Sequence, residues 1–271
     1  MIKTISILGC GWLGLPFGQY LVDKGWIVKG STTTPGKQEQ LRASQIKPYI
    51  IKLDEIETCP NVDFFTSEYL LINVPPSKAF RQAEAYDPLI DQINATGIKK
   101  VILVSSTSVY QSQNSTVAEE STDEMPKGAN AILDIERTFK KEAFDTTIIR
   151  FGGLIGGQRY PGRFFKADST VKGAHTPVNL IHLDDCIQTL DAVITKNIWG
   201  ETINGVADTH PTKKEFYTLA SQLKNRALPQ FIEDESPFKI VSNYKLKNKL
   251  GVQLRHPDLM AMLKDSKLWK E

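Results

Sequence analysis

Three glycines near the amino terminus constrain the fold of this chain more than any other feature. Gly9, Gly11 and Gly14 form the pattern G-x-G-x-x-G directly after a short apolar run and at the opening of an amphipathic stretch. In a strand–turn–helix unit the first glycine permits a tight turn, the second lets the backbone approach a diphosphate, and the third lets helix and strand pack closely. The pattern predicts a dinucleotide-binding turn that includes Trp12 and Leu13, and the alternative is a turn that only eases packing.

The spacing of apolar residues predicts that this unit is part of a larger α/β fold. Runs rich in Ile, Leu and Val alternate with amphipathic stretches, as in parallel βαβ proteins. The predicted strands are Thr4–Leu8, Trp26–Gly30, Pro48–Leu53, Tyr69–Val74, Lys100–Ser105 and Thr146–Phe151. The predicted helices are Leu13–Lys24, Lys37–Ser44, Lys78–Thr96 and Ala131–Ala143. Right-handed crossovers between them predict a Rossmann-like, doubly wound parallel sheet.

The alternation loosens after residue 151, where a glycine-rich loop is followed by short mixed elements. Ligands of open α/β sheets bind beyond the carboxyl ends of the strands, so a substrate lobe is expected in this part of the chain. We therefore expect a dinucleotide-binding Rossmann domain at residues 1–151. A smaller C-terminal substrate lobe is expected at residues 152–271, partly returning to the main sheet.

The end of the second predicted strand bears on the choice between NAD and NADP. An acidic residue there would hydrogen-bond the ribose 2′-hydroxyl of NAD and repel a 2′-phosphate. Here the strand is followed by the hydroxyls of Ser31, Thr32 and Thr33, with either Lys29 or Lys37 as the nearby lysine, and it has no acid at its end. Hydrogen bonds from these groups favour NADP, with NAD as the alternative because no Arg supplies a bidentate fork. A plain Ser/Thr turn with an exposed lysine is the non-binding interpretation.

The end of the fourth predicted strand supplies a second set of cofactor contacts. Asn73, Val74 and Pro75 lie at the edge where the ribose and phosphates pass in this fold class. We expect this backbone to contact the cofactor. The alternative for Asn73 is that its side chain only forms hydrogen bonds within the turn.

Several segments resemble the extended short-chain dehydrogenase/reductase superfamily, specifically the NAD-dependent epimerase/dehydratase family. Val104–Tyr110 is similar to the SSxxVY signature of the family's fifth strand, and Arg150–Gly156 resembles its R-x-x-x-x-x-G exit from the sixth. Asn179–Asp185 resembles its N-x-I-H-V-x-D segment. The resemblance implies an NAD(P)-binding oxidoreductase or epimerase-like enzyme that acts on a small hydroxyl or carbonyl substrate, such as a sugar nucleotide. It also implies pairing into a homodimer.

The chain departs from this family at the catalytic Tyr-x-x-x-Lys pair. If Glu136 matches the family's glutamate on that helix, Gly128 stands in the place of the tyrosine and Ile132 in that of the lysine, so neither can carry a proton. Ser106 matches the family's catalytic Ser/Thr; its alternative role is to cap the strand end. The resemblance is thus to atypical members. The enzyme hypothesis competes with a non-catalytic protein that senses NADP and regulates or scaffolds partners.

Four residues are candidates for contact with a substrate. Tyr110 is the tyrosine closest along the chain to the missing pair, although its family counterpart is structural. Arg159 and Arg163, in the loop after the sixth strand, would hold an anionic substrate or be solvated loop charges. His175 lies in a second glycine-containing loop and has the same two interpretations. His182 is expected to be a packing and hydrogen-bonding residue.

Composition excludes several other classes of function. The formal net charge is only +2, so no field suited to nucleic acid or a membrane surface is expected. Cys10, Cys59 and Cys186 are widely spaced, with no CxxC pair and no clustered His, which argues against a disulfide framework and against a metal site. A small-molecule substrate and a cytoplasmic location are therefore expected.

Overall fold

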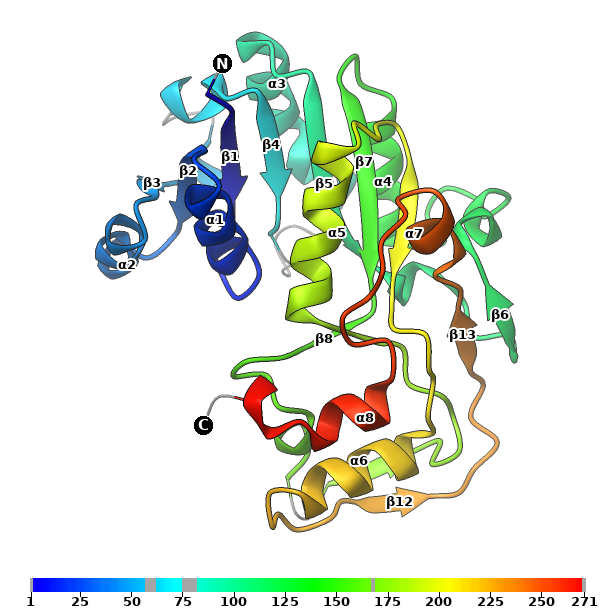
Figure 1. The fold of residues 1–271 in the computed structure, drawn as a ribbon. Coiled ribbons are helices and arrows are strands. Elements are labelled where there is room, and N and C mark those ends of the chain that lie inside the picture. The colour runs from blue at the N-terminus through cyan, green and yellow to red at the C-terminus, as the bar shows by residue number, and fades with distance from the viewer. Residues whose placement is uncertain (1, 57–61, 75–81, 167–168, 270–271) are drawn as a thin grey trace. The chain divides into compact units, whose positions relative to one another are not determined.

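The structure is a computed structural model that describes residues 2–56, 62–74, 82–166 and 169–269. Its central feature is a parallel sheet of seven strands in the order β11-β7-β5-β4-β1-β2-β3, flanked by helices (Figure 1). The strands are β1 (Thr4–Leu8), β2 (Ile27–Thr32), β3 (Lys47–Ile50), β4 (Tyr69–Ile72), β5 (Lys100–Ser106), β7 (Asp145–Phe151) and β11 (Thr202–Gly205). This confirms the predicted Rossmann-like fold.

The contacts within the chain group its residues into two compact units. The first comprises residues 1–105, 125–149 and 197–202, and the second comprises residues 106–124, 150–196 and 203–271. Both units are discontinuous in sequence, because the chain leaves the sheet after β5 and again after β7. The predicted single division at residue 151 stays a proposal about the chain's organisation.

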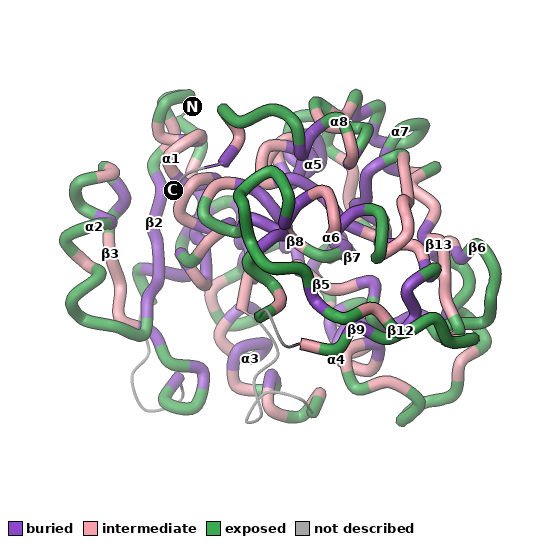
Figure 2. Tube along the Cα trace, turned by 90° about the horizontal axis from the view of Figure 1, so that it is seen from below, coloured by how far each residue is buried: buried purple, intermediate pink, exposed green. Residues whose placement is uncertain are grey.

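In the first unit the four predicted helices are present, with different ends. They are α1 (Gly14–Asp23), α2 (Gln38–Ala43), α3 (Asp87–Thr96) and α4 (Ala131–Lys140). The helix expected to begin at Lys78 begins at Asp87, with Pro88 in its first turn, where a missing N–H costs nothing. Residues 78–81 lie outside the described ranges. In Figure 2 the trace of β2 is buried along most of its length, while most of α2 is exposed.

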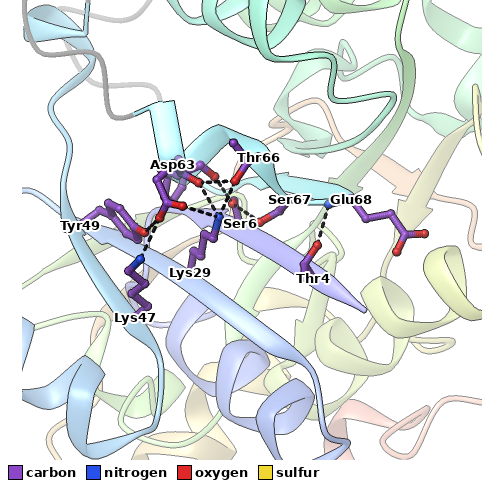
Figure 3. Close-up of polar contacts among 10 residues, drawn as sticks. Thr4, Ser6, Lys29, Lys47, Tyr49, Asp63, Thr66, Ser67 and Glu68 are labelled. Atoms are coloured by element: carbon purple, nitrogen blue, oxygen red, sulfur yellow. Dashed lines mark hydrogen bonds and ion pairs between the residues drawn. The ribbon is translucent and has the colours of Figure 1, made fainter. Parts of the chain in front are cut away.

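Lys29 lies in the middle of β2 and is buried against the segment that precedes β4 (Figure 3). Its ammonium donates to the backbone carbonyl of Asp63 and to the hydroxyl of Thr66, at 2.8 Å for the latter. The carboxylate of Asp63 in turn accepts from Tyr49 and, at 2.9 Å, from Lys47. The Lys29 side chain therefore holds the sheet to this segment, and the expectation that it helps to bind a phosphate is wrong.

The Asp63 carboxylate gives this network a dependence on pH. Hydrogen bonds from Tyr49 and Lys47 lower its pKa from 3.8 to about 2. A lowered folded-state pKa adds stability above the unfolded-state pKa, and that stability is lost as the pH falls from about 4 to about 2. We expect Asp63→Asn to melt below the wild type at pH 7 and the gap in Tm to close towards pH 2. An equal gap at both pH values would contradict this role.

Within its described residues, the second unit contains short strands, mostly paired in parallel, and four α-helices. Its strands outside the main sheet are β6 (Ser115–Val117), β8 (Gly153–Ile155), β9 (Thr170–Lys172), β10 (Leu180–His182), β12 (Gln230–Ile232) and β13 (Lys239–Val241). Its helices are α5 (Leu183–Thr195), α6 (Lys213–Gln222), α7 (Tyr244–Asn248) and α8 (Leu259–Lys264). Its core includes Tyr160, Phe216 and Trp269. Within the described residues, every helix is too short or too polar to cross a bilayer.

Candidate cofactor site

The glycine turn between β1 and α1 is fixed by two polar side chains from neighbouring strands. Gly9 has a φ of 103°, which disfavours any residue with a side chain. Its N–H donates to the Ser31 hydroxyl at 2.9 Å, and its carbonyl accepts from the Asn73 side-chain amide at 3.0 Å. Two predicted contact residues, Ser31 and Asn73, thus hold the turn that would hold the cofactor.

The space around the three glycines fits a bound diphosphate. A Cβ at Gly9 would lie 2.5 Å from the carbonyl oxygen of Asn73, and a Cβ at Gly14 would lie 2.3 Å from the carbonyl oxygen of Gly9. These two glycines are therefore required by packing. A Cβ at Gly11 would have no described atom within 4 Å. The protein's own packing does not explain Gly11, whereas an approaching phosphate does.

A cavity of about 310 Å³ opens beside the turn. The residues that line it come from the ends of β1 to β4: Leu8, Gly9, Cys10, Gly11, Ser31, Thr32, Thr33, Thr34, Lys37, Ile51, Lys52, Leu53, Asp54, Asn73 and Val74. It therefore combines an apolar floor with hydroxyls, two ammonium groups and one carboxylate. This chemistry suits an adenosine with phosphate attached.

The polar groups of the cavity differ in their availability to a ligand. The Thr32 hydroxyl accepts from the N–H of Thr34 at 3.1 Å, and the Lys52 ammonium contacts Glu55 at 2.7 Å. Thr33 and Lys37 are exposed, and the Lys37 ammonium has no ion pair or hydrogen bond within the described residues. Lys37 is therefore the cation that a ligand would meet first.

Sequence reasoning missed Asp54, and not all of the residues that it predicted for the cofactor line the cavity. Asp54 lies in the turn after β3 and lines the cavity. In the sequence it directly follows the predicted third strand, Pro48–Leu53, and that position could have signalled it. Leu13 is buried and Trp12 is half-buried at the start of α1, outside the cavity lining. Val74 lines the cavity, and Pro75 lies outside the described residues.

The positions that the resemblance aligns with the tyrosine and lysine lie in a turn and in the first turn of α4. Gly128 precedes α4 in a turn with a φ of 84°, and its N–H donates to Asp134 at 2.9 Å. The helix begins only after Asn130, whose side-chain oxygen accepts from the N–H of Ile132 at 2.9 Å. Neither Gly128 nor Ile132 offers a group that transfers a proton.

A buried carboxylate lies at the end of β5 within the first unit. Glu136 is 2% exposed and accepts a hydrogen bond from the Ser105 hydroxyl. The next residue, Ser106, accepts from the N–H of Ser108 at 3.1 Å and caps the short turn that follows the strand. That contact is the capping role expected as the alternative, and it leaves the Ser106 hydroxyl proton available for donation. Catalysis by Ser106 stays a prediction.

Tyr110 lies in a buried network of the second unit. Its hydroxyl donates to Asn204 at 2.6 Å and accepts from Arg150 at 2.8 Å. Burial raises the pKa of Tyr110 to about 12. Arg150 also donates to the Glu119 carbonyl at 3.1 Å and to the Thr122 hydroxyl at 3.0 Å. These contacts give Tyr110 a structural role and favour that alternative over contact with a substrate.

The remaining candidates for substrate contact are all exposed. Arg159 and Arg163 flank the buried Tyr160 in the loop after β8. The His175 ring lies 3.6 Å from the Glu233 carboxylate, which also contacts Lys214 at 2.6 Å. Their exposure is compatible with ligand binding and equally with a solvated surface.

Comparisons with known proteins show what the chain is similar to. A family model described as NAD(P)H-binding matches residues 69–181. Protein YeeZ of Escherichia coli strain K12 is 31% identical over 272 residues, covering 96% of this chain and 99% of that protein.

Solved structures share the fold. A functionally unknown conserved protein from Silicibacter pomeroyi has a TM-score of 0.81 and 22% identity, with 98% of each chain covered. UDP-glucuronic acid 4-epimerase from Bacillus cereus, in complex with NAD, has a TM-score of 0.77 and 17% identity, covering 97% of this chain and 96% of that one. UDP-glucose 4-epimerase from Thermotoga maritima, with UDP-glucose, has a TM-score of 0.73 and 15% identity, covering 97% and 98%.

These findings agree with the residues in identifying an NAD(P)-binding domain. The chain therefore belongs to the family of Protein YeeZ, and its residues 69–181 match an NAD(P)H-binding family model.

Proposed function

We propose that this protein is an NADP-dependent oxidoreductase or epimerase-like enzyme that acts on a small hydroxyl or carbonyl substrate, with a sugar nucleotide as the favoured class. The observation that carries the proposal is the glycine turn with the adjoining cavity of about 310 Å³. Solved structures of the same fold were determined with UDP-glucose or with NAD, which supports the substrate class. A bound cofactor would supply or accept the hydride.

The preference for NADP rests on the end of β2 and the residues after it. Thr33 and Lys37 are exposed at the cavity, and the segment from Thr33 to Lys37 after β2 contains no acid. An ammonium and a hydroxyl would donate charge-assisted hydrogen bonds to a 2′-phosphate. The Asp54 carboxylate follows β3 and would accept from an exocyclic amine of adenine, which both cofactors share.

Substitution of Lys37 tests the choice of cofactor. Lys37→Ala is expected to weaken NADPH binding about tenfold, since one solvent-exposed charge-assisted contact is lost, and to leave NADH binding unchanged. Isothermal titration calorimetry with both cofactors measures this. Lys99→Ala removes an exposed lysine outside the cavity and is the matched control. Equal weakening of NADPH and NADH would overturn the proposed 2′-phosphate contact.

The enzyme hypothesis assigns the Ser106 hydroxyl to the reacting oxygen of the substrate, which it would polarise by donating its proton. Arg159 and Arg163 would hold an anionic part of the substrate, and His175 would line its entry.

Ser106→Ala is expected to lower kcat about 100-fold on any substrate found, with Ser108→Ala as the control of similar size. The assay follows NADPH absorbance at 340 nm with a panel of carbonyl compounds and sugar nucleotides. No oxidation of NADPH across the panel would count against an enzyme.

A second candidate function is a non-catalytic sensor of NADP, which the absence of a phenol and an amine at Gly128 and Ile132 favours. This candidate predicts a change in oligomeric state or in partner binding when the ratio of NADPH to NADP changes, with a homodimer as one of the states. Light scattering of the protein with NADPH and with NADP measures the oligomeric state in each condition, and a difference favours the sensor. A cytoplasmic location remains part of the proposal, because the described cysteines Cys10 and Cys186 are both buried free thiols.

A further inference from the structure

Two histidines and an aspartate converge within the second unit. His182 ends β10, Asp184 is in the first turn of α5, and His256 lies in the segment before α8. One donor atom from each lies within 4.8 Å of the other two. The Asp184 Oδ2 atom is 3.1 Å from His256 Nε2 and 3.5 Å from His182 Nδ1. The spacing of 72 residues between Asp184 and His256 explains why sequence inspection found no His cluster.

The surrounding chain holds these three side chains in place. The buried carboxylate of Asp185 accepts from the N–H of Arg255 at 2.6 Å and from the N–H of His256 at 3.1 Å. The two imidazole rings lie edge to face, with centroids 4.3 Å apart. Neighbouring groups that fix the orientation of ligands are a regular feature of metal sites. The backbone around His256 is therefore held next to α5 by tertiary contacts.

The donor atoms of the cluster lie close together. The Nδ1 atom of His182 is 3.5 Å from the Asp184 carboxylate oxygen and accepts from the N–H of Asp184 at 3.2 Å, a contact that a metal ion would replace. His182 is 3% exposed, and its Nε2 atom has no hydrogen-bond partner within the described residues. His256 and Asp184 are partly exposed, which leaves a path for an ion.

We propose that His182, Asp184 and His256 form a binding site for one divalent transition metal ion, with Zn²⁺ as the best match. Two imidazole nitrogens and one carboxylate oxygen are the ligands of three-residue zinc sites, in which water takes the fourth position. At bond lengths of about 2.0 to 2.2 Å, tetrahedral ligands lie roughly 3.4 Å apart. The Asp184 carboxylate oxygen lies at similar distances, 3.1 Å and 3.5 Å, from the nitrogens of His256 and His182. The site contains none of the residues proposed above for binding cofactor or substrate.

Titration with Zn²⁺ of protein stripped by a chelator tests this proposal. We expect the wild type to bind one Zn²⁺ with a Kd of about 1 µM or tighter by calorimetry. Its Tm should rise with the Zn²⁺ concentration, because the ion binds the folded protein. Co²⁺ at the same site should give the visible absorption of a four-coordinate ion. His256→Gln and Asp184→Asn, both at partly exposed positions, are expected to weaken binding about 100-fold or more. Circular dichroism of each variant verifies folding.

His175→Gln is the matched control, because His175 and Glu233 form an exposed histidine–carboxylate pair with fewer donors. It is expected to bind Zn²⁺ as the wild type does. The proposal is overturned if the wild type takes up no Zn²⁺, if folded His256→Gln and Asp184→Asn bind as the wild type does, or if His175→Gln loses as much affinity as they do. A proton shared between His256 and Asp184 would then account for the cluster.

Discussion

Gly11→Val is expected to lower the affinity for nicotinamide dinucleotides about 1000-fold or more while leaving the protein folded. Gly11 lines the cavity, and a Cβ there would meet no described atom within 4 Å. The added methyl groups would therefore be tolerated by the protein and would occupy the space where the diphosphate approaches the backbone. Calorimetry with NADPH and NADH measures the loss of affinity, and thermal melting measures folding.

Gly14→Val is the contrasting variant at the same turn. A Cβ at Gly14 would lie 2.3 Å from the carbonyl oxygen of Gly9, so α1 could not pack against the turn as it does now. We expect this variant to melt far below the wild type or to fail to fold. If folded Gly11→Val still bound NADPH with wild-type affinity, the cofactor would not lie against this turn and the proposed function would fall with it.

Arg150→Met is expected to lower the free energy of unfolding by about 3 to 5 kcal/mol. The guanidinium is 3% exposed and donates to the Tyr110 hydroxyl, the Glu119 carbonyl and the Thr122 hydroxyl. Its removal leaves buried oxygens that have lost their donor and that water cannot reach. Urea denaturation at pH 7, followed by circular dichroism, measures the difference.

Tyr110→Phe provides the graded control for this network. It removes one hydroxyl whose partners are Asn204 and Arg150, so a smaller loss of about 1 to 2 kcal/mol is expected. A loss for Arg150→Met no larger than that for Tyr110→Phe would mean that the network adds little to stability. Such a result would reopen a substrate-binding role for the Tyr110 hydroxyl.

The predicted strands were all found, because buried parallel strands leave a strong signal of consecutive Ile, Leu and Val. Their ends shifted by only a few residues, as for β3, which ends at Ile50 and was expected to reach Leu53. The helix expected from Lys78 shows the limit of such reasoning. Apolar spacing continues before Asp87, yet the regular helix begins there, with Pro88 fixing its first turn.

The sequence alone located the glycine turn, because the pattern that identifies it is local. A strand, three glycines at fixed spacing and a helix lie within Thr4–Asp23, so the chemistry can be read from neighbouring positions. Only the tertiary structure decided the direction of Lys29 and the meeting of His256 with Asp184. Each of these depends on which strands and loops become neighbours. Packing of the whole chain sets those neighbours, and no local pattern records them.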